Sequence, residues 1–180
     1  MTNTKGFKSV KTSFRYLVTI LVTLLVLSYA FPLFAQTTGV NFSGTWSLNE
    51  SKSNFGDSQF RFAATSIVIK HEGNNLTDER IQPGFDGGEM KTTEILTLDG
   101  KVCENTGMMD SKRKSTVTWS ADNKSITIAT SMVFDMGGES SEMKSSETWK
   151  LGEDGKSLIM ESVFSSPNGD MKTTIVYDKK

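Results

Sequence analysis

The sequence contains one cysteine, one histidine and three prolines in 180 residues. A single thiol, Cys103, cannot form an intramolecular disulfide, so the folded chain depends on a hydrophobic core. A single histidine, His71, means that a hydrolytic triad or a histidine-rich metal site would have to be built around that one residue. We expect His71 to be an exposed turn residue and Cys103 to be a buried, inert thiol. Neither residue indicates an enzyme.

The sequence also lacks the common cofactor motifs. It has no glycine-rich phosphate loop, no Cys-x-x-Cys pair and no calcium-binding loop. The methionines near SMVFDMGG at 131–138 are spaced as strand interior and are not concentrated with His or Cys, as they usually are in metal chaperones that bind Cu(I). No cofactor and no metal site are therefore predicted.

The first 35 residues have the layout of an export signal. Four basic residues precede an apolar run that starts at Leu17, and small residues follow at possible cleavage positions after Ala30 and Ala35. The competing interpretation is an uncleaved membrane anchor, since the run is nearly long enough to span a bilayer. Cleavage after Ala35 is preferred, which predicts a signal peptide at 1–35 and a secreted or periplasmic domain at 36–180.

Without the signal, the predicted domain is mildly acidic. The 20 Lys and Arg residues, less the four of the signal, leave 16 against 21 Asp and Glu residues, a net charge of −5. Such a domain has no electrostatic reason to bind nucleic-acid phosphates, so no nucleic-acid partner is predicted. The one basic cluster, SKRK at 111–114, is expected in a solvated loop.

Short runs rich in Val, Ile, Thr, Phe and Trp alternate with Gly, Asn and Asp clusters from residue 42 onward. Helical spacing is nowhere sustained, which indicates antiparallel strands joined by tight turns. Asp-Gly and Asn-Gly pairs supply the positive φ angles of short hairpin turns. Ten strands are predicted, near 43–49, 64–71, 75–82, 89–98, 101–106, 114–120, 125–134, 141–151, 157–165 and 170–178.

A strand–turn–strand unit recurs along the chain. The segments EMKTTE at 89–94, EMKSSE at 142–147 and DMKTTI at 170–175 are nearly the same, and 117–134 aligns with 147–164. Consecutive hairpins without crossovers most economically close on themselves, because closure removes exposed sheet edges. The predicted fold is all-β, an antiparallel up-and-down β-barrel of 8–10 strands with each strand hairpinned to the next.

Period-2 alternation assigns one face of each strand to the barrel interior. In the repeated strand, methionine and a hydroxyl residue share the inward face with glutamate, or with isoleucine in the third copy, while the lysine after each methionine points to solvent. An apolar floor under a mouth of methionine and hydroxyl side chains is typical of a small-ligand cavity, although the same methionines would also fill a solid core. The predicted ligand-binding residues are Met90, Thr92, Glu94, Met132, Met143, Ser145, Glu147, Met160, Met171 and Thr173.

The segment NFSGTWSLNESKSNFG at 41–56 resembles the Gly-x-Trp signature that opens lipocalins and the wider calycin group. Its triplet, Gly44-Thr45-Trp46, falls on the first predicted strand. The resemblance is to a bacterial, lipocalin-like exported domain that binds a hydrophobic small molecule. It implies that Gly44 lets the chain turn in tightly and that Trp46 plugs the closed end of the barrel, often under a basic side chain such as Lys179 or Lys180.

The sequence departs from that family in two respects. Ten predicted strands exceed the eight of a typical lipocalin, and the family's carboxy-terminal helix and disulfide are missing from the pattern. The related fatty-acid-binding barrels have ten strands but carry a helix pair after the first one, and 50–64 is too polar and glycine-broken to match that pair. The resemblance therefore supports the architecture more than any ligand.

The sequence predicts an exported protein, not an enzyme, that holds an apolar or amphipathic ligand in a barrel cavity. The competing hypothesis is a ligand-free structural or protein-interaction module of the cell envelope, whose partner the sequence does not identify. A membrane-embedded barrel is disfavoured, because Lys91, Lys144 and Lys172 would face lipid at roughly 2–4 kcal/mol each near the midplane. No membrane insertion is predicted once the signal is removed.

Overall fold

The computed structural model describes residues 39–56, 63–84, 87–107, 111–136, 139–166 and 169–180. The chain divides into two units after residue 36, and the strands belong to the second unit, Thr37–Lys180. The predicted signal peptide at 1–35 lies outside the described residues. Within the described part, no helix is long and apolar enough to cross a bilayer.

The described residues form ten strands and one short 3₁₀ helix, η1, at Glu50–Lys52. All ten predicted strands are present, each within two residues of its expected bounds, and the all-β prediction is confirmed. The strands are β1 Gly44–Leu48, β2 Ser66–Glu72, β3 Asn75–Pro83, β4 Glu89–Thr97, β5 Val102–Thr106, β6 Lys112–Trp119, β7 Ser125–Met136, β8 Glu139–Leu151, β9 Ser157–Ser166 and β10 Gly169–Lys179.

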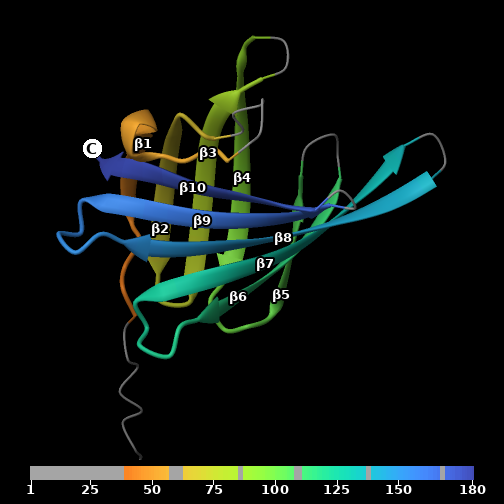
Figure 1. Cartoon of the computed structure of the whole chain (residues 1–180). Coiled ribbons are helices and arrows are strands. Elements are labelled where there is room, and N and C mark those ends of the chain that lie inside the picture. The colour runs from red at the N-terminus through yellow and green to blue at the C-terminus, as the bar shows by residue number, and fades with distance from the viewer. Residues whose placement is uncertain (1–38, 57–62, 85–86, 108–110, 137–138, 167–168) are drawn as a thin grey trace, which may run out of the picture. The chain divides into compact units, whose positions relative to one another are not determined.

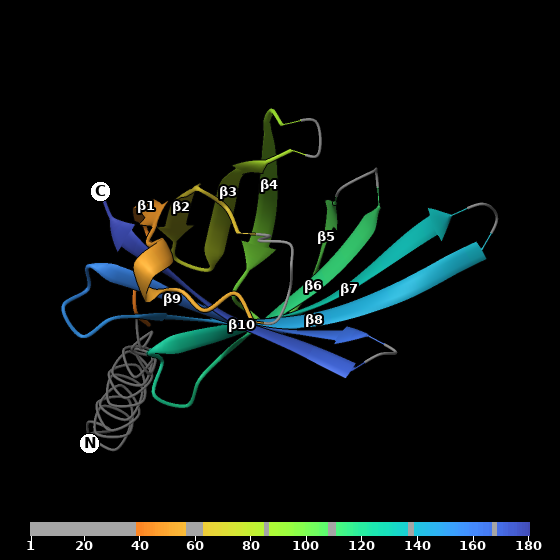
Figure 2. The ribbon, with the colours of Figure 1, turned by 45° about the horizontal axis from the view of Figure 1, so that its top comes forward.

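The strands form one antiparallel sheet in the order β4-β3-β2-β1-β10-β9-β8-β7-β6-β5. The first and last strands pair, with Trp46 opposite Lys179. Strands β8, β9 and β10 run across β2, β3 and β4, so the sheet curls over on itself (Figure 1, Figure 2). The result is a nearly closed up-and-down barrel whose two sheet edges are β4 and β5.

The expectation of a hairpin between every two successive strands is wrong at two places. Strands β1 and β2 pair, but the connection between them contains η1 and is too long for a hairpin turn. Strands β4 and β5 follow one another through a tight turn, yet the described residues show no backbone ladder between them. The opening in the ladder therefore lies in the middle of the chain.

Side chains take the place of the missing ladder between β4 and β5. The amide of Asn105 accepts a hydrogen bond from Ile95 N at 2.9 Å and donates one to Ile95 O at 3.0 Å. An asparagine amide can do this because it carries the same donor and acceptor as a peptide group. Cys103, which is half-buried where a buried thiol was expected, accepts from Thr97 N through Sγ at 3.1 Å.

The hydrophobic core contains Trp46, which is fully buried. Its indole Nε1 donates to Phe42 O at 3.1 Å, and Lys179 Nζ lies 5.3 Å from the ring centroid. Gly44 has a φ of 153°, and a Cβ there would lie 3.0 Å from Lys179 Cε. A larger residue at 44 would thus displace the lysine. Lys179 therefore lies over Trp46 as the resemblance implies, while the plugging role itself stays a prediction.

His71 is buried, with 9% of its surface exposed, so the expectation of an exposed turn residue is wrong. It continues the inward face of β2 after Ile67 and Ile69, where alternation places it in the core. Its Nδ1 accepts from Phe42 N at 3.3 Å, and its ring stacks on Phe42. Burial lowers the pKa of His71, which keeps the imidazole neutral.

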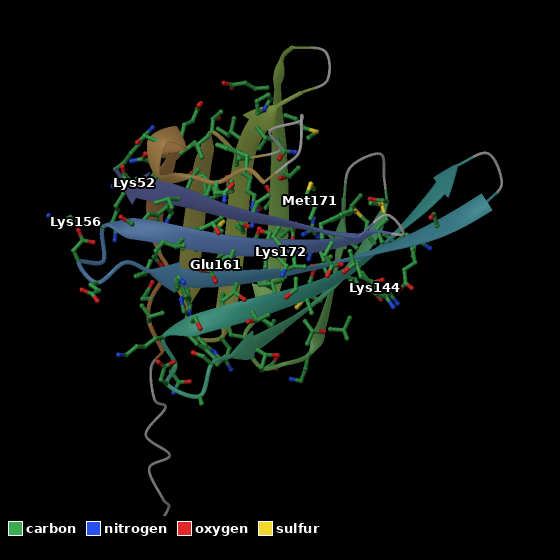
Figure 3. All side chains as sticks on the ribbon, viewed as in Figure 1. Lys52, Lys144, Lys156, Glu161, Met171 and Lys172 are labelled. Atoms are coloured by element: carbon green, nitrogen blue, oxygen red, sulfur yellow. The ribbon has the colours of Figure 1, made fainter. Side chains whose placement is uncertain are left out.

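The outward faces of the strands are largely polar, as the alternation predicts, with Ile95 and Val102 as exposed apolar exceptions. Lys91, Lys144 and Lys172 are all exposed. Figure 3 shows Lys144, Glu161 and Lys172 on the outside of β8, β9 and β10. Solvent-exposed ion pairs on this surface, such as Lys150 with Glu161, contribute little to stability. The surface ion pairs therefore contribute little to the stability of the barrel, which rests mainly on its interior.

Candidate functional site: a charged layer inside the barrel

The strand register arranges the interior side chains of β3 and β4 in tiers. Leu76 lies opposite Leu96, and both are almost completely buried. Two residues further along, Asp78 lies opposite Glu94. Met90 comes near the far end of β4 and is partly exposed. Along these strands, an apolar floor is thus followed by a charged tier. A partly exposed methionine comes next, and this end of the interior is called the mouth.

Strands β7 and β8 repeat the same order on another wall of the barrel. The floor is apolar, a glutamate follows, then two hydroxyl residues face each other, and two methionines come last. From floor to mouth, the opposed pairs are Ile126 with Trp149, Ile128 with Glu147, Thr130 with Ser145, and Met132 with Met143.

The predicted ligand-binding residues become more exposed from floor to mouth. Met160 is 2% exposed and belongs to the core cluster, whereas Met143 and Met132 are partly exposed and Met171 is 36% exposed. Figure 3 labels Met171 on β10. Inward-facing side chains are exposed where other strands do not cover them, and the far ends of β7 and β8 extend beyond β2, β3 and β4 (Figure 2). The structure therefore assigns Met160 to the floor and places the other predicted methionines toward the less covered ends of their strands.

Arg80 on β3 is the centre of the charged tier. Its Nε donates to Asp78 Oδ2 at 2.7 Å, and its Nη2 donates to Glu147 Oε1 at 2.7 Å. Its guanidinium carbon lies 5.6 Å from the centroid of the Trp149 ring, close enough for a cation–π contact. One guanidinium therefore joins carboxylates from β3 and β8.

Sequence reasoning placed Glu147 inside the barrel but did not single out Asp78 or Arg80. The alternation of residues along β3 does identify these two as interior residues. Leu76 is an evident buried position, and Asp78 and Arg80 follow it at intervals of two on the same face of β3. Charged residues in phase with a buried leucine indicate an interior ion pair, and Glu147, which the sequence places inside the barrel, is the partner of Arg80 from another strand.

Glu147 is well provided with hydrogen-bond donors. Trp149 Nε1 donates to Oε1 at 2.6 Å and Ser162 Oγ donates to Oε2 at 3.0 Å, in addition to Arg80. Burial is the largest single influence and favours the neutral acid, but the charge of Arg80 and these hydrogen bonds together lower the pKa of Glu147 to about 2. Glu147 is therefore ionised at neutral pH.

Asp78 lies deeper and has fewer partners. It is 2% exposed, and its Oδ1 has no hydrogen-bond partner among the described residues. Burial raises the pKa of Asp78 to about 6; Arg80 opposes the shift, and the negative charges of Glu147 and Glu94 add to it. Of the two carboxyl groups that share Arg80, Asp78 is the one that takes up a proton under mildly acidic conditions.

A second ion pair lies beside the first. Arg113 Nη1 is 3.1 Å from Glu94 Oε1, which links β6 to β4 across the seam next to β5. The expectation that 111–114 forms a solvated loop is wrong, because Lys112 begins β6 and alternation turns Arg113 inward with Ser115. Arg113 Nε is a buried donor with no acceptor among the described residues.

The arrangement is suited to binding the polar part of a small molecule. Guanidinium, carboxylate, indole and hydroxyl groups converge between an apolar floor and a methionine-lined mouth, as in sites that orient a ligand in a largely apolar surrounding. Among the described residues, no group of three or more His, Cys, Asp and Glu side chains is placed to hold a metal ion.

Comparisons with known proteins identify the fold. No protein-family model matches the sequence, and no curated protein matches it. The structure is similar to the crystal structure of zebrafish ileal bile acid-binding protein complexed with cholic acid, with 16% sequence identity and a TM-score of 0.51. The similarity covers 77% of this chain and 98% of that one. The chain has a calycin-like fold.

Proposed function

We propose that the protein is an exported, lipocalin-like binding protein that holds an apolar or amphipathic small molecule inside its barrel. The observation that carries the proposal is the tiered interior. Inward-facing methionine side chains are partly exposed at one end, above a charged tier that is largely shielded from solvent. An amphipathic ligand would place its apolar part among the methionines and its polar end against the charged tier.

Two further observations support this proposal. The structural neighbour is, by its title, a bile acid-binding protein in complex with cholic acid. The Gly44-Thr45-Trp46 triplet lies on β1 with Lys179 over the indole ring, as in the lipocalin resemblance. Export is proposed from the basic and apolar layout of residues 1–35, and the cleaved product would be secreted or periplasmic.

The alternative is a ligand-free interaction module of the cell envelope. It is favoured by two large apolar side chains on outward faces at the open seam, Ile95 at 63% exposure and Val102 at 61%. Apolar groups beside an unpaired sheet edge are a common feature of contact surfaces. In this case the interior would be filled by its own side chains.

Mass spectrometry distinguishes the two hypotheses. Protein purified from its native host without detergent would be extracted with organic solvent, and the extract compared with that of a variant in which Met132 and Met143 are both replaced by Asp. A small molecule present in proportion to the wild-type protein and lost from the variant supports binding. Its absence from the wild-type extract, together with failure to bind added decan-1-ol, contradicts binding and favours the interaction module.

Export has a separate test. Amino-terminal sequencing of the protein recovered outside the cytoplasm should show a chain that begins at Gln36, or at Phe31 if cleavage follows Ala30. A chain that keeps its first residues and stays with the membrane would contradict removal of the signal. Neither result bears on whether the barrel binds a ligand.

A further inference from the structure

The charged tier contains more acid than base. Among the described side chains it contains three carboxyl groups, Asp78, Glu94 and Glu147, and two guanidinium groups, Arg80 and Arg113. Fully ionised, the tier has a net charge of 2 − 3 = −1. A net charge that is shielded from water is unfavourable unless another charge or a hydrogen-bond donor offsets it.

The unbalanced negative charge can be assigned to one atom, Asp78 Oδ1. Arg80 contacts Asp78 through Oδ2, and Glu147 has donors on both of its oxygens. Asp78 Oδ1, in a residue with 2% exposure, has none among the described residues. Asp78 lies on the inward face of β3 directly opposite Glu94, so its free oxygen belongs to the interior and not to the outer surface.

On the basis of the proposed function, we infer that the interior selects ligands whose polar end donates hydrogen bonds, a primary ammonium above all. A ligand that enters between the methionines meets the charged tier with its polar end. An ammonium group offsets the excess negative charge and donates to Asp78 Oδ1. The ligand class is a single-chain or compact apolar molecule with an amine at one end.

A carboxylate ligand meets the opposite situation. Both guanidinium groups already have carboxylate partners, Arg80 with Asp78 and Glu147, and Arg113 with Glu94. An added anion would change the net charge of the tier from −1 to −2 and would compete with the carboxylates of the tier for the two guanidinium groups. Trp149 Nε1 and Ser162 Oγ are also occupied, since both donate to Glu147.

Among the described side chains of the tier, one guanidinium nitrogen has no hydrogen-bond partner. Arg113 Nε is buried without an acceptor among the described residues, so it accommodates a neutral oxygen. An alcohol, which both donates and accepts, therefore suits the tier better than a carboxylate does. The expected order of affinity is amine, then alcohol, then carboxylate.

Isothermal titration calorimetry with three ligands of equal chain length tests this order. The mature domain would be titrated at about pH 7.5 with decylammonium, decan-1-ol and decanoate. Since a hydrogen bond to a charged group contributes more than a neutral one, decylammonium should bind roughly tenfold or more tighter than decanoate. Equal affinities, or tighter binding of decanoate, would overturn the inference while leaving the proposed function intact.

A matched pair of variants ties the selectivity to Asp78. D78N should reduce the preference for decylammonium over decanoate by roughly tenfold, whereas E153Q, which removes an exposed carboxylate, should leave it unchanged. Circular dichroism verifies folding, and the wild-type series decides the inference even if D78N does not fold. Binding of none of the three ligands overturns the proposed function and the inference together.

Discussion

Arg80 Nη2 lies 2.7 Å from Glu147 Oε1, and this contact joins two strands that are not neighbours in the sheet. Strand β3 and strand β8 are separated in the ladder by β2, β1, β10 and β9. The contact therefore crosses the barrel interior and ties its two walls together. Both side chains are shielded, with exposures of 22% and 23%. An ion pair in this position stabilises the barrel only while both partners are present.

Removal of Arg80 should strongly destabilise the domain. R80M leaves Asp78 and Glu147 without their guanidinium, and breaking a buried pair in this way costs about 3–5 kcal/mol. Urea unfolding at about pH 7.5, followed by tryptophan fluorescence, measures the loss. The control is K150M, which breaks the exposed pair with Glu161 and should change stability by less than about 1 kcal/mol. A loss for R80M no larger than the control would contradict a buried ion pair.

Asp78 should make the protein less stable as the pH rises, the opposite of the effect of a carboxylate whose pKa is lowered by an ion pair. Its pKa is about 6 in the folded protein and 3.8 in the unfolded chain, so the folded state binds the proton more tightly. The contribution of this group is fully present below about pH 3.8 and is lost as the pH rises through 6. D78N removes this dependence. At pH 8 the variant should gain up to about 3 kcal/mol relative to wild type, and at pH 4 almost none.

Urea unfolding of wild type and D78N across the range from pH 4 to 8 provides the measurement. Glu147 acts in the opposite sense and in a different window, because its lowered pKa of about 2 gives stability that is lost only below about pH 4.5. Arg80 keeps its charge throughout the range. The exposed variant E153Q serves as control. A difference between D78N and wild type that is constant with pH would refute the assignment.

The ten strands could be predicted from the sequence because two signals agreed. Alternation identified the inward faces, and Asp-Gly and Asn-Gly pairs identified the turns at Gly100, Gly155 and Gly169, all of which have positive φ. The pairing of β1 with β10 follows from closure but has no local sequence signal. The break between β4 and β5 has no local sequence signal either, since the Asp99-Gly100 turn between them is an ordinary hairpin turn sequence.

The candidate site was predicted in part. The inward methionines and the two glutamates came directly from the repeat, but the repeat has no copy of Asp78, Arg80 or Arg113. The sequence pattern predicts a loop at Arg113, because charge clusters usually face solvent. Arg113 can be recognised as an interior residue because it lies on the same face of β6 as Val117, which is fully buried. A charged residue inside a barrel is recognised because it alternates in step with buried residues on its strand. Its residue type alone suggests a solvent-exposed position.

The seam between β4 and β5 should open when Asn105 is replaced. N105L removes the amide that substitutes for the backbone ladder at Ile95, and the loss of two hydrogen bonds at a partly exposed site should cost about 1–2 kcal/mol. Native-state hydrogen exchange would show faster exchange of the Ile95 amide. T106A, an exposed change on the same strand, should leave that rate unaltered. Equal protection in N105L and wild type would show that the seam is held by other contacts.

Floor and mouth methionines should respond differently to truncation. M160A removes a side chain that is 2% exposed and packed in the core cluster, so it should cost about 2–5 kcal/mol in urea unfolding, with part of the loss arising from the cavity left behind. M143A truncates a partly exposed side chain and should cost about 1 kcal/mol or less. Decan-1-ol titration should show the reverse ranking, with M143A weakening binding and M160A, where it remains folded, changing it little. If both variants lose stability equally and neither changes binding, then Met143 packs a solid core and the mouth is not a ligand site.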